Sequence, residues 1–285
     1  MNLVNKGTLY ICPTPIGNLE DITIRVLNTL KNADLIAAED TRHTLKLLNH
    51  FEIQKPLTSY HEHNKKTKGP ILVNKLLDGE NIALVSDAGM PGISDPGADM
   101  VKLCIEEGIR FEVLPGATAS ILALVASGLD TTKFAFEGFL DRDKKERRKR
   151  LENIKREDRT LIFYEAPHRI ISTLEDIFNI LGNRRGVIAR ELTKRYEEFI
   201  RGSLTELIDH LKLNPPKGEI VLLCEGVNLE EEAIEAQNKL EEITIKDHII
   251  LLMEDGLDKK TAVKEVAKLR NISKRDVYKE AIDLE

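Results

Sequence analysis

Glycine, proline and aspartate are concentrated in residues 86–97, which read SDAGMPGISDPG and directly follow an apolar run. Open parallel α/β sheets bind ligands beyond the carboxyl ends of their strands, and glycine lets the backbone approach a ligand closely. Proline removes an N–H donor, so neighbouring backbone groups need other partners. This stretch therefore predicts a backbone cradle for a small molecule. The alternative is a long turn held by its own side chains.

Other motifs that would define a chemistry are missing from the sequence. There is no G-x-x-x-x-G-K-S/T loop and no G-x-S-x-G elbow, and the first predicted strand leads into TPIGN rather than G-x-G-x-x-G. The HEH triplet at residues 61–63 lacks the H-E-x-x-H spacing, so we expect a polar loop and no metal there. Cys12, Cys104 and Cys224 are far apart in apolar runs, which predicts buried thiols.

The elements that must position the glycine-rich stretch alternate between short apolar runs and segments of helical period. In the first half, strands are predicted at residues 8–13, 35–40, 81–87 and 110–116, and helices at 21–33, 41–51, 70–79 and 97–108. This alternation is typical of a mostly parallel α/β sheet. In the second half, strands are predicted at 134–139, 159–167, 184–193 and 218–226, and helices at 118–128, 168–181 and 203–212. From residue 229 on, the sequence is helix-forming with little strand character.

Length, charge and hydropathy exclude several classes of protein. The 285 residues are enough for about two domains. A net charge of -6 excludes a globally basic nucleic-acid binder, so an anionic partner must be met by a local patch. The first residues do not resemble a signal peptide, and no run approaches the roughly 18 apolar residues of a membrane span. We therefore expect a soluble, cytoplasmic protein with no membrane partner.

The predicted strand ends, taken together, resemble those of one family. CPTPIGNLEDIT, AAEDTRHT, SDAGMPGISDPG, LPGATASILALVASGL, FYEAPHR, ARELTKRYEE and KGEIVLL follow in this order over residues 9–223. The set resembles the tetrapyrrole methylase superfamily of S-adenosylmethionine (SAM)-dependent methyltransferases. Within it, the set looks like the branch that methylates the ribose 2′-hydroxyl of a cytidine in small-subunit (16S) ribosomal RNA. The corrin and porphyrin branch carries G-x-G-x-G-D where residues 14–18 read TPIGN, which favours the RNA branch.

The resemblance implies an architecture as well as an activity. We expect two α/β domains, residues 1–114 and 115–228, with SAM bound in the cleft between them and no metal. A small helical unit would follow at residues 229–285. The family is typically dimeric, so a homodimer is expected.

The resemblance also implies a set of cofactor-binding residues. They are Pro15, Gly17, Asp87, Ala88, Gly89, Pro91, Ile93, Gly116, Thr118, Tyr164, Ala166 and Gly218, with Met90, Ser120, Glu165, Glu219, Ile220 and Val221 nearby. Alternatives stay open for three of them. Gly116 fits a simple turn, Tyr164 fits a core aromatic, and Asp87 fits a cap of its own loop.

Methyl transfer to a ribose hydroxyl needs alignment and is helped by a general base. Asp40 or Glu39 is the favoured base, with Arg42 and Glu191 as further catalytic candidates. Other charged groups at the same strand ends are His43, His168, Arg169, Arg190 and Lys194. Carboxylates mixed with arginines suit a site that holds RNA phosphates while it deprotonates a hydroxyl. The alternative is that Glu39 and Arg42 form structural ion pairs that bridge the domains.

Two segments are candidates for contact with small-subunit ribosomal RNA or the 30S subunit. The first is a basic run that contains Arg142, Lys144, Lys145, Arg147, Arg148, Lys149 and Arg150. Interleaved acids leave a solvated helix as the alternative. The second is the tail from residue 244, where Ser273 and Asp276 predict a helix start within a possible helix-turn-helix; a plain packing bundle is the alternative.

The sequence is also compatible with two other functions. One is a methyltransferase of the same superfamily that acts on a tetrapyrrole or on a protein side chain. The other is a non-catalytic RNA-binding protein that uses the basic run and the tail.

Overall fold

The computed structural model describes residues 6–228, 243–270, 272–282 and 284. The chain divides into two compact units, Met1–Gly226 and Val227–Glu285, and the first unit holds two five-stranded sheets. Strands of the first sheet come from residues 8–113, and those of the second from residues 134–224. The boundaries expected at residues 114 and 228 stay predictions, and the helical sequence expected from residue 229 lies outside the described residues as far as 242.

The first sheet is entirely parallel, as the alternation of its sequence predicts. Its strands are β1 (Thr8–Ile11), β2 (Leu35–Ala38), β3 (Leu57–Ser59), β4 (Ile82–Val85) and β5 (Arg110–Val113). They are ordered β3-β2-β4-β1-β5, and every neighbouring pair is parallel. All carboxyl ends therefore meet at one edge of the sheet, where the loops after β1, β2 and β4 lie. The edge strand β3 has only three residues and was not predicted.

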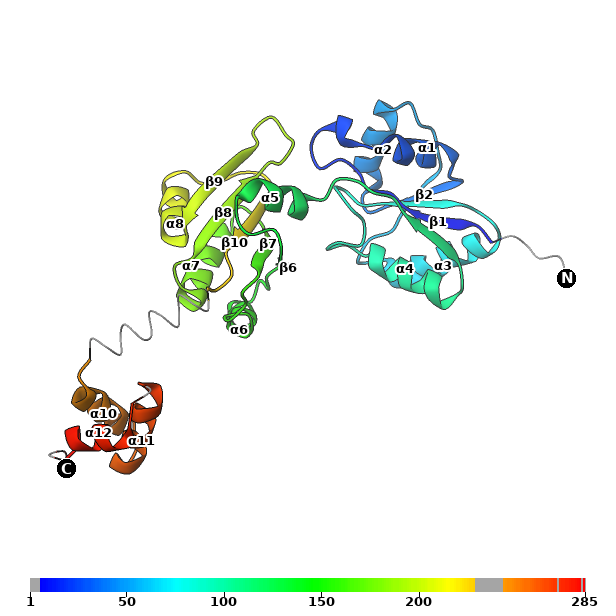
Figure 1. The fold of residues 1–285 in the computed structure, drawn as a ribbon. Helices are drawn as coiled ribbons and strands as arrows, with labels where there is room; N and C mark the ends of the chain where they lie inside the picture. The colour runs from blue at the N-terminus through cyan, green and yellow to red at the C-terminus, as the bar shows by residue number, and fades with distance from the viewer. Residues whose placement is uncertain (1–5, 229–242, 271, 283, 285) are drawn as a thin grey trace. The chain divides into compact units, whose positions relative to one another are not determined.

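Helices cover both faces of this sheet (Figure 1). In chain order the helical elements are η1 (Leu19–Asp21), α1 (Ile24–Asn32), α2 (Thr41–His50), α3 (Lys65–Leu77) and α4 (Gly97–Glu106). Along β2, Ile36 packs in the core beneath α1 and α2, whereas Ala37 packs in the core beneath α3 and α4. Burial on both faces explains why the strands read as continuous apolar runs.

The second sheet is mixed. Its strands are β6 (Phe134–Phe139), β7 (Thr160–Glu165), β8 (Arg185–Arg190), β9 (Glu198–Ser203) and β10 (Ile220–Cys224). They are ordered β6-β7-β10-β8-β9; β6 and β7 are parallel, and the other neighbours are antiparallel. The edge strand β9 was not predicted either. The carboxyl end of β7 and the amino end of β10 thus lie side by side, which matters for the site.

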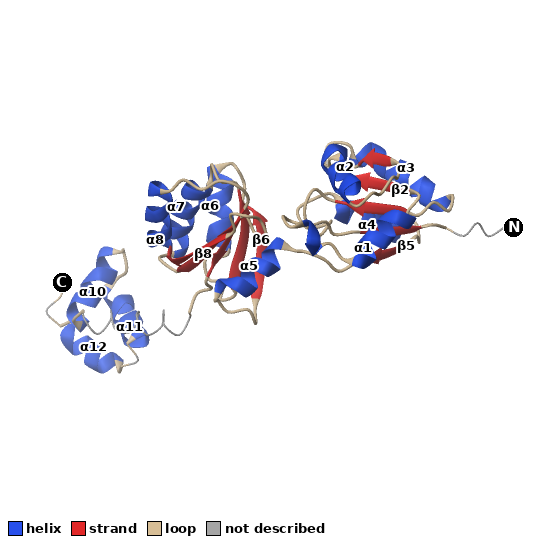
Figure 2. Cartoon of the chain, turned by 90° about the horizontal axis from the view of Figure 1, so that it is seen from above, coloured by secondary structure: helices blue, strands red, loops and turns tan. Residues whose placement is uncertain are grey.

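Helices again cover both faces of the second sheet (Figure 2). They are α5 (Ala119–Ser127), α6 (Lys144–Asn153), α7 (Ile170–Leu181) and α8 (Leu204–Leu213). Leu151, Leu174 and Leu207 of α6, α7 and α8 pack on one face. On the other face α5 packs together with Ile16, which comes from the loop after β1 of the first sheet. The three cysteines are buried free thiols, as predicted.

The basic run forms α6, and three of its arginines are held by carboxylates. Arg147 is buried, and its Nη2 lies 2.6 Å from Oδ2 of Asp176. Nε of Arg148 lies 3.1 Å from the other oxygen of Asp176, and Nη2 of Arg150 lies 2.6 Å from Glu137. Arg142, Lys144, Lys145 and Lys149 are exposed. The run therefore combines a structural anchor with an exposed basic surface.

The second compact unit is a small helical bundle. It contains α10 (Ile245–Glu254), α11 (Lys259–Leu269) and α12 (Lys274–Glu280), whose buried residues Ile249, Val263 and Val277 share one core. Oγ of Ser273 accepts a hydrogen bond from the backbone N–H of Asp276, so the predicted start of the last helix is confirmed.

Replacing the buried arginine should destabilise the first unit. In Arg147→Met, Asp176 loses its closest counter-ion inside the protein, and removing one partner of a buried pair costs about 3 to 5 kcal/mol. Lys149→Met on the exposed side of the same helix is the control. Urea unfolding followed by circular dichroism suits this chain, which has no tryptophan. Equal midpoints for the two variants would contradict the structural role of Arg147.

Candidate functional site

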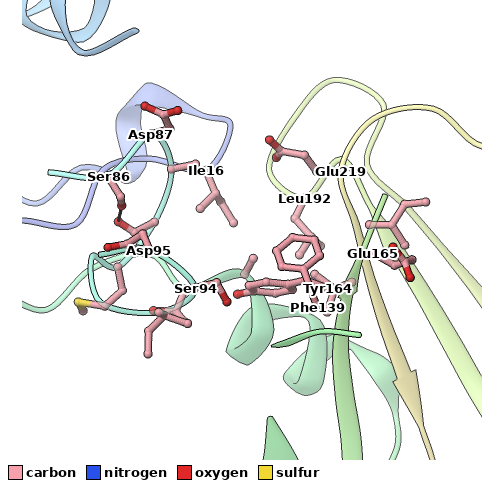
Figure 3. Close-up of a pocket in the computed structure, with 18 of the residues that line it drawn as sticks. Ile16, Ser86, Asp87, Ser94, Asp95, Phe139, Tyr164, Glu165, Leu192 and Glu219 are labelled. Carbon is pink, nitrogen blue, oxygen red and sulfur yellow. Dashed lines mark hydrogen bonds between the residues drawn. The ribbon is translucent and has the colours of Figure 1, made fainter. Parts of the chain in front are cut away.

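A cavity of about 420 Å³ lies where loops of the two sheets face each other (Figure 3). The loop after β4 forms one side, together with Ile16 and Glu39 from the loops after β1 and β2. The opposite side comes from the ends of β6 and β7, the start of β10 and the β8–β9 loop. Its residues are Phe139, Tyr164, Glu165, Ala166, Pro167, Leu192, Gly218, Glu219, Ile220 and Val221. The size falls within the roughly 300 to 1,000 Å³ of small-molecule sites.

The loop after β4 owes its shape to residues that favour turns. Gly89, Gly92 and Ser94 have positive φ values of 80°, 92° and 68°. Both carboxylate oxygens of Asp95 accept from the N–H of Gly92, and Oδ1 also accepts from the N–H of Gly97 at 2.8 Å. The loop is thus held partly by its own aspartate, yet residues 86–90 and 93–95 also line the cavity. The turn is thus held by its own side chain at Asp95, and the backbone cradle for a small molecule stays a prediction.

A short backbone bridge joins this loop to the loop after β1. The N–H of Thr14 donates to the carbonyl of Gly89, and the N–H of Gly89 donates to the carbonyl of Thr14, both at 3.0 Å. The hydroxyl of Thr14 donates to the carbonyl of Ser86 at 3.1 Å. A Cβ at Gly89 would lie 3.2 Å from Ile16. The bridge therefore sets where Ile16 meets the cavity.

The far side of the cavity is largely apolar. The ring of Tyr164 meets the rings of Phe136 and Phe139 edge-on, with centroids 4.9 and 5.6 Å apart. Leu192 and Val221 complete this surface and belong to the core cluster that includes Ile16. A rigid aromatic and aliphatic wall suits a flat heteroaromatic ring.

The charged side chains that line the cavity are all acidic. Glu39, Asp87, Asp95, Glu165 and Glu219 contribute carboxylates, and no lysine, arginine or histidine is among the lining residues that the structure describes. Three of these carboxylates have partners: Asp95 holds its loop, Glu165 pairs with Arg169, and Glu219 pairs with Lys194. Glu39 and Asp87 form no ion pair within the described residues. Such a lining favours a ligand with positive charge.

Glu39 is the carboxylate most altered by this environment. Burial raises the pKa of Glu39 above its ordinary value, and the nearby charges of Asp87 and Asp95 act in the same direction. The N–H of Asp87, which donates to Glu39 at 3.3 Å, acts against them. A carboxylate with a raised pKa in a cavity is a candidate proton acceptor.

Asp40, the neighbour of Glu39, has a different role. Its side chain caps α2 by accepting from the N–H of Arg42 at 2.8 Å, and it pairs with the Arg42 guanidinium at 2.7 Å. These hydrogen bonds hold the pKa of Asp40 well below its usual range. Neither Asp40 nor Arg42 is among the residues that line the cavity. The alternative that Glu39 and Arg42 form ion pairs that bridge the domains is not what the described residues show, because Arg42 pairs with Asp40 of the same loop and Glu39 forms no ion pair among them.

Glu191 occupies a strained turn beside the cavity rather than its wall. Its φ is 51°, and Thr193 two residues later has a φ of 62°. Burial would raise the pKa of Glu191, but hydrogen bonds from Lys194 and from the N–H of Glu219 hold it below its ordinary value. A Cβ on Gly218 would collide with its carboxylate. Strain of this kind persists where the surroundings enforce it, and here it presents Leu192 to the cavity.

Comparison with known proteins shows to which family the chain belongs. A model of tetrapyrrole (corrin/porphyrin) methylases matches residues 8–208. The chain belongs to the tetrapyrrole methylase family. Among curated relatives, "Ribosomal RNA small subunit methyltransferase I" of Halalkalibacterium halodurans is 53% identical over 96% of this chain and 94% of its own length. The protein of the same name from Bacillus subtilis is 50% identical, with the same coverage of each chain.

Solved structures share the methylase fold at low identity. The methyltransferase CobJ aligns with a TM-score of 0.60 at 19% identity, covering 78% of this chain and 95% of its own. Uroporphyrin-III C-methyltransferase from Thermus thermophilus, solved in complex with S-adenosylhomocysteine, aligns with a TM-score of 0.54 at 18% identity over 76% of this chain and 97% of its own. The predicted fold, two α/β domains of the tetrapyrrole methylase type, is confirmed.

The structure of this methylase brings most of the residues proposed for cofactor binding together. Eight of them line the cavity: Asp87, Ala88, Gly89, Ile93, Thr118, Tyr164, Ala166 and Gly218. Pro15 and Gly17 line a neighbouring cavity instead. Pro91 and Gly116 line neither, and Gly116 packs against Pro13. Lining residues that the sequence did not single out are Ile16, Ser86, Ser94, Asp95, Ala119, Phe139, Pro167 and Leu192.

The described residues contain no group of three or more histidine, cysteine, aspartate or glutamate side chains that could hold a metal ion. None of the helices in this part of the chain combines the length and apolar character that a membrane crossing requires.

The raised pKa of Glu39 is measurable by carbon-13 NMR of its side-chain carboxyl group. We expect a midpoint above the ordinary value of 4.5. Asp87→Asn should lower it, because one of the charges that disfavour ionisation is removed. Asp40→Asn is the control and should leave it unchanged. A midpoint at or below 4.5, or an equal effect of both variants, would contradict this picture of the site.

Proposed function

We propose that this chain is a SAM-dependent methyltransferase that acts on small-subunit ribosomal RNA. The observation that carries the proposal is the match to relatives named for that activity along 96% of the chain. The target would be the ribose 2′-hydroxyl of a cytidine, presented on free RNA or on the 30S subunit. We propose that the protein works in the cytoplasm as a homodimer.

The residues of the 420 Å³ cavity, called the acidic cavity from here on, fit SAM. The sulfonium and ammonium groups of SAM outweigh its single carboxylate, so the molecule is a net cation. The charged groups that the described residues bring to the cavity are carboxylates. Tyr164 and Phe139 offer a flat surface for adenine. The positive φ at Gly89 leaves backbone rather than a side chain facing the ligand. Thr118, the N-cap of α5, makes no side-chain cap bond, which leaves its hydroxyl available.

The chemistry requires alignment and removal of one proton. When bound, SAM supplies a methyl carbon whose bond to sulfur breaks as the bond to the ribose oxygen forms, with the electron pair remaining on sulfur. Glu39 accepts the hydroxyl proton, directly or through one water. Burial raises the pKa of Glu39, and the charge of Asp87 adds to this while the N–H of Asp87 acts against it. The enclosed wall of Ile16, Leu192 and Val221 excludes bulk water from one side of the reacting atoms.

Two exposed surfaces extend the proposal to the RNA. Arg142, Lys144, Lys145 and Lys149 of the α6 region are accessible for phosphates, whereas Arg147 is not because it is buried. In the second unit, α11 and α12 form the two helices of the suggested helix-turn-helix, and α12 carries Lys274 and Arg275 at exposed positions. These groups would add affinity without reading sequence.

Methyl transfer tests the assignment directly. Labelled SAM and small ribosomal subunits from a strain that lacks this gene should yield one labelled cytidine ribose per subunit, located by mass spectrometry of nuclease fragments. Label that appears only in a tetrapyrrole or a protein would replace the proposed substrate. Absence of SAM binding in calorimetry would favour a non-catalytic RNA-binding protein.

The role of Glu39 predicts a specific loss of rate. Glu39→Gln removes the proton acceptor, so kcat should fall roughly 10²- to 10⁴-fold while the Kd for SAM changes little. The rate of the wild-type enzyme should increase with pH through the raised pKa of Glu39, because only the ionised form accepts a proton. Asp40→Asn is the matched control and keeps most of the activity, since asparagine also caps a helix. Equal rates for the two variants would exclude Glu39 as the base.

A further inference from the structure

A second cavity, of about 510 Å³, adjoins the acidic one. It is bounded by the loop after β1, by α2 and by the β8–β9 loop, and its lining includes His43, Lys46 and Lys194. Five residues line both cavities: Ile16, Ser86, Ala88, Asp87 and Glu219. Figure 3 shows Asp87 and Glu219 on opposite sides of the same end of the acidic cavity. The shared residues form a partition with two faces.

The two sides of this partition differ in their basic side chains. Among the residues that the structure describes, no lysine, arginine or histidine lines the acidic cavity, whereas His43, Lys46 and Lys194 line the second one. The carboxylates of the second cavity, Asp87 and Glu219, both belong to the partition. A cationic ligand is therefore favoured on one side, and an anionic ligand on the other.

Two of the basic side chains in the second cavity are available to bind a ligand. Nζ of Lys194 lies 3.0 Å from Glu191 and 3.1 Å from Glu219, so its charge is already matched. The side chains of Lys46 and His43 form no ion pair or hydrogen bond with the described residues. They are three positions apart on α2, so they project from one face of the helix.

We infer that the second cavity receives one unpaired nucleotide of the RNA, with Lys46 and His43 facing the phosphates that flank it. The inference rests on the proposed function and adds where the acceptor binds. A nucleotide is similar in size to the methyl donor, itself a nucleoside joined to an amino acid, and the two cavities are similar in volume. A paired base would bring its complementary strand, so the target is taken from a single-stranded segment or turned out of a helix.

Transfer of the methyl group from the donor to the ribose hydroxyl then takes place at the partition. The ribose hydroxyl approaches from the second cavity past Ser86, Asp87 and Ala88, which place backbone and small side chains at the boundary. Asp87 lines both cavities, and Glu39, which accepts from the N–H of Asp87, lies on the donor side, where one water can carry the hydroxyl proton to it. Donor and acceptor meet without either entering the cavity of opposite preference.

Lys46→Met tests the inference because the side chain is exposed and its loss leaves the fold intact. The KM for RNA should increase about tenfold, with kcat and the Kd for SAM nearly unchanged. A lost phosphate contact should also reduce the slope of log kcat/KM against log salt by about 0.7. Lys46→Arg should restore both. The control is Lys31→Met, which removes the same charge from an exposed position on α1 outside both cavities.

The outcomes separate this inference from the proposed function. If the wild-type protein methylates the RNA but Lys46→Met matches Lys31→Met in KM and in salt slope, the second cavity is not the acceptor site. If the wild-type protein transfers no methyl group to ribosomal RNA, the proposed function fails and the inference with it. A change in the Kd for SAM equal to the change in KM for RNA would also overturn the inference, because Lys46 would then act on the donor.

Discussion

The pair of backbone hydrogen bonds between Thr14 and Gly89 is the interaction on which the site depends. It joins the loops after β1 and β4, which would otherwise be independent segments at the edge of a parallel sheet. One consequence is that Ile16 packs against Leu192 and Val221 in the core of the second sheet. Another is that Ser86, Asp87 and Ala88 separate two cavities. Main-chain hydrogen bonds suit this purpose, because their geometry does not depend on a flexible side chain.

The two cavities differ in their charged residues because different elements line them. The loops after β2 and β4 bring Glu39, Asp87 and Asp95 to one cavity, and α2 brings Lys46 to the other. The charges of Asp40, Glu165 and Lys194 are neutralised by ion pairs with neighbouring side chains. We propose that this arrangement suits the transfer of a methyl group from a cationic donor to a polyanionic acceptor, because the donor side is acidic and basic side chains lie on the acceptor side.

Much of this structure could be predicted from sequence, and the misses have physical causes. The strand–helix alternation predicts the parallel sheet because buried strands are apolar throughout. The edge strands β3 and β9 escape detection, since one has three residues and the other reads EFIRGS, with mixed polarity. Ile16, Phe139 and Leu192 were missed because an apolar residue that faces a ligand looks the same in sequence as one that faces the core. The adjacent acids Glu39 and Asp40 differ in role because one follows its strand into the cavity and the other caps a helix.

We propose that the acidic cavity alone holds the methyl donor. A crystal structure of the protein grown with S-adenosylhomocysteine tests it most directly. We expect the adenine against Tyr164, the amino-acid portion along the loop at Gly89, and the sulfur facing the partition at Asp87. Density for the ligand in the second cavity, or at any place outside the acidic cavity, would contradict the account.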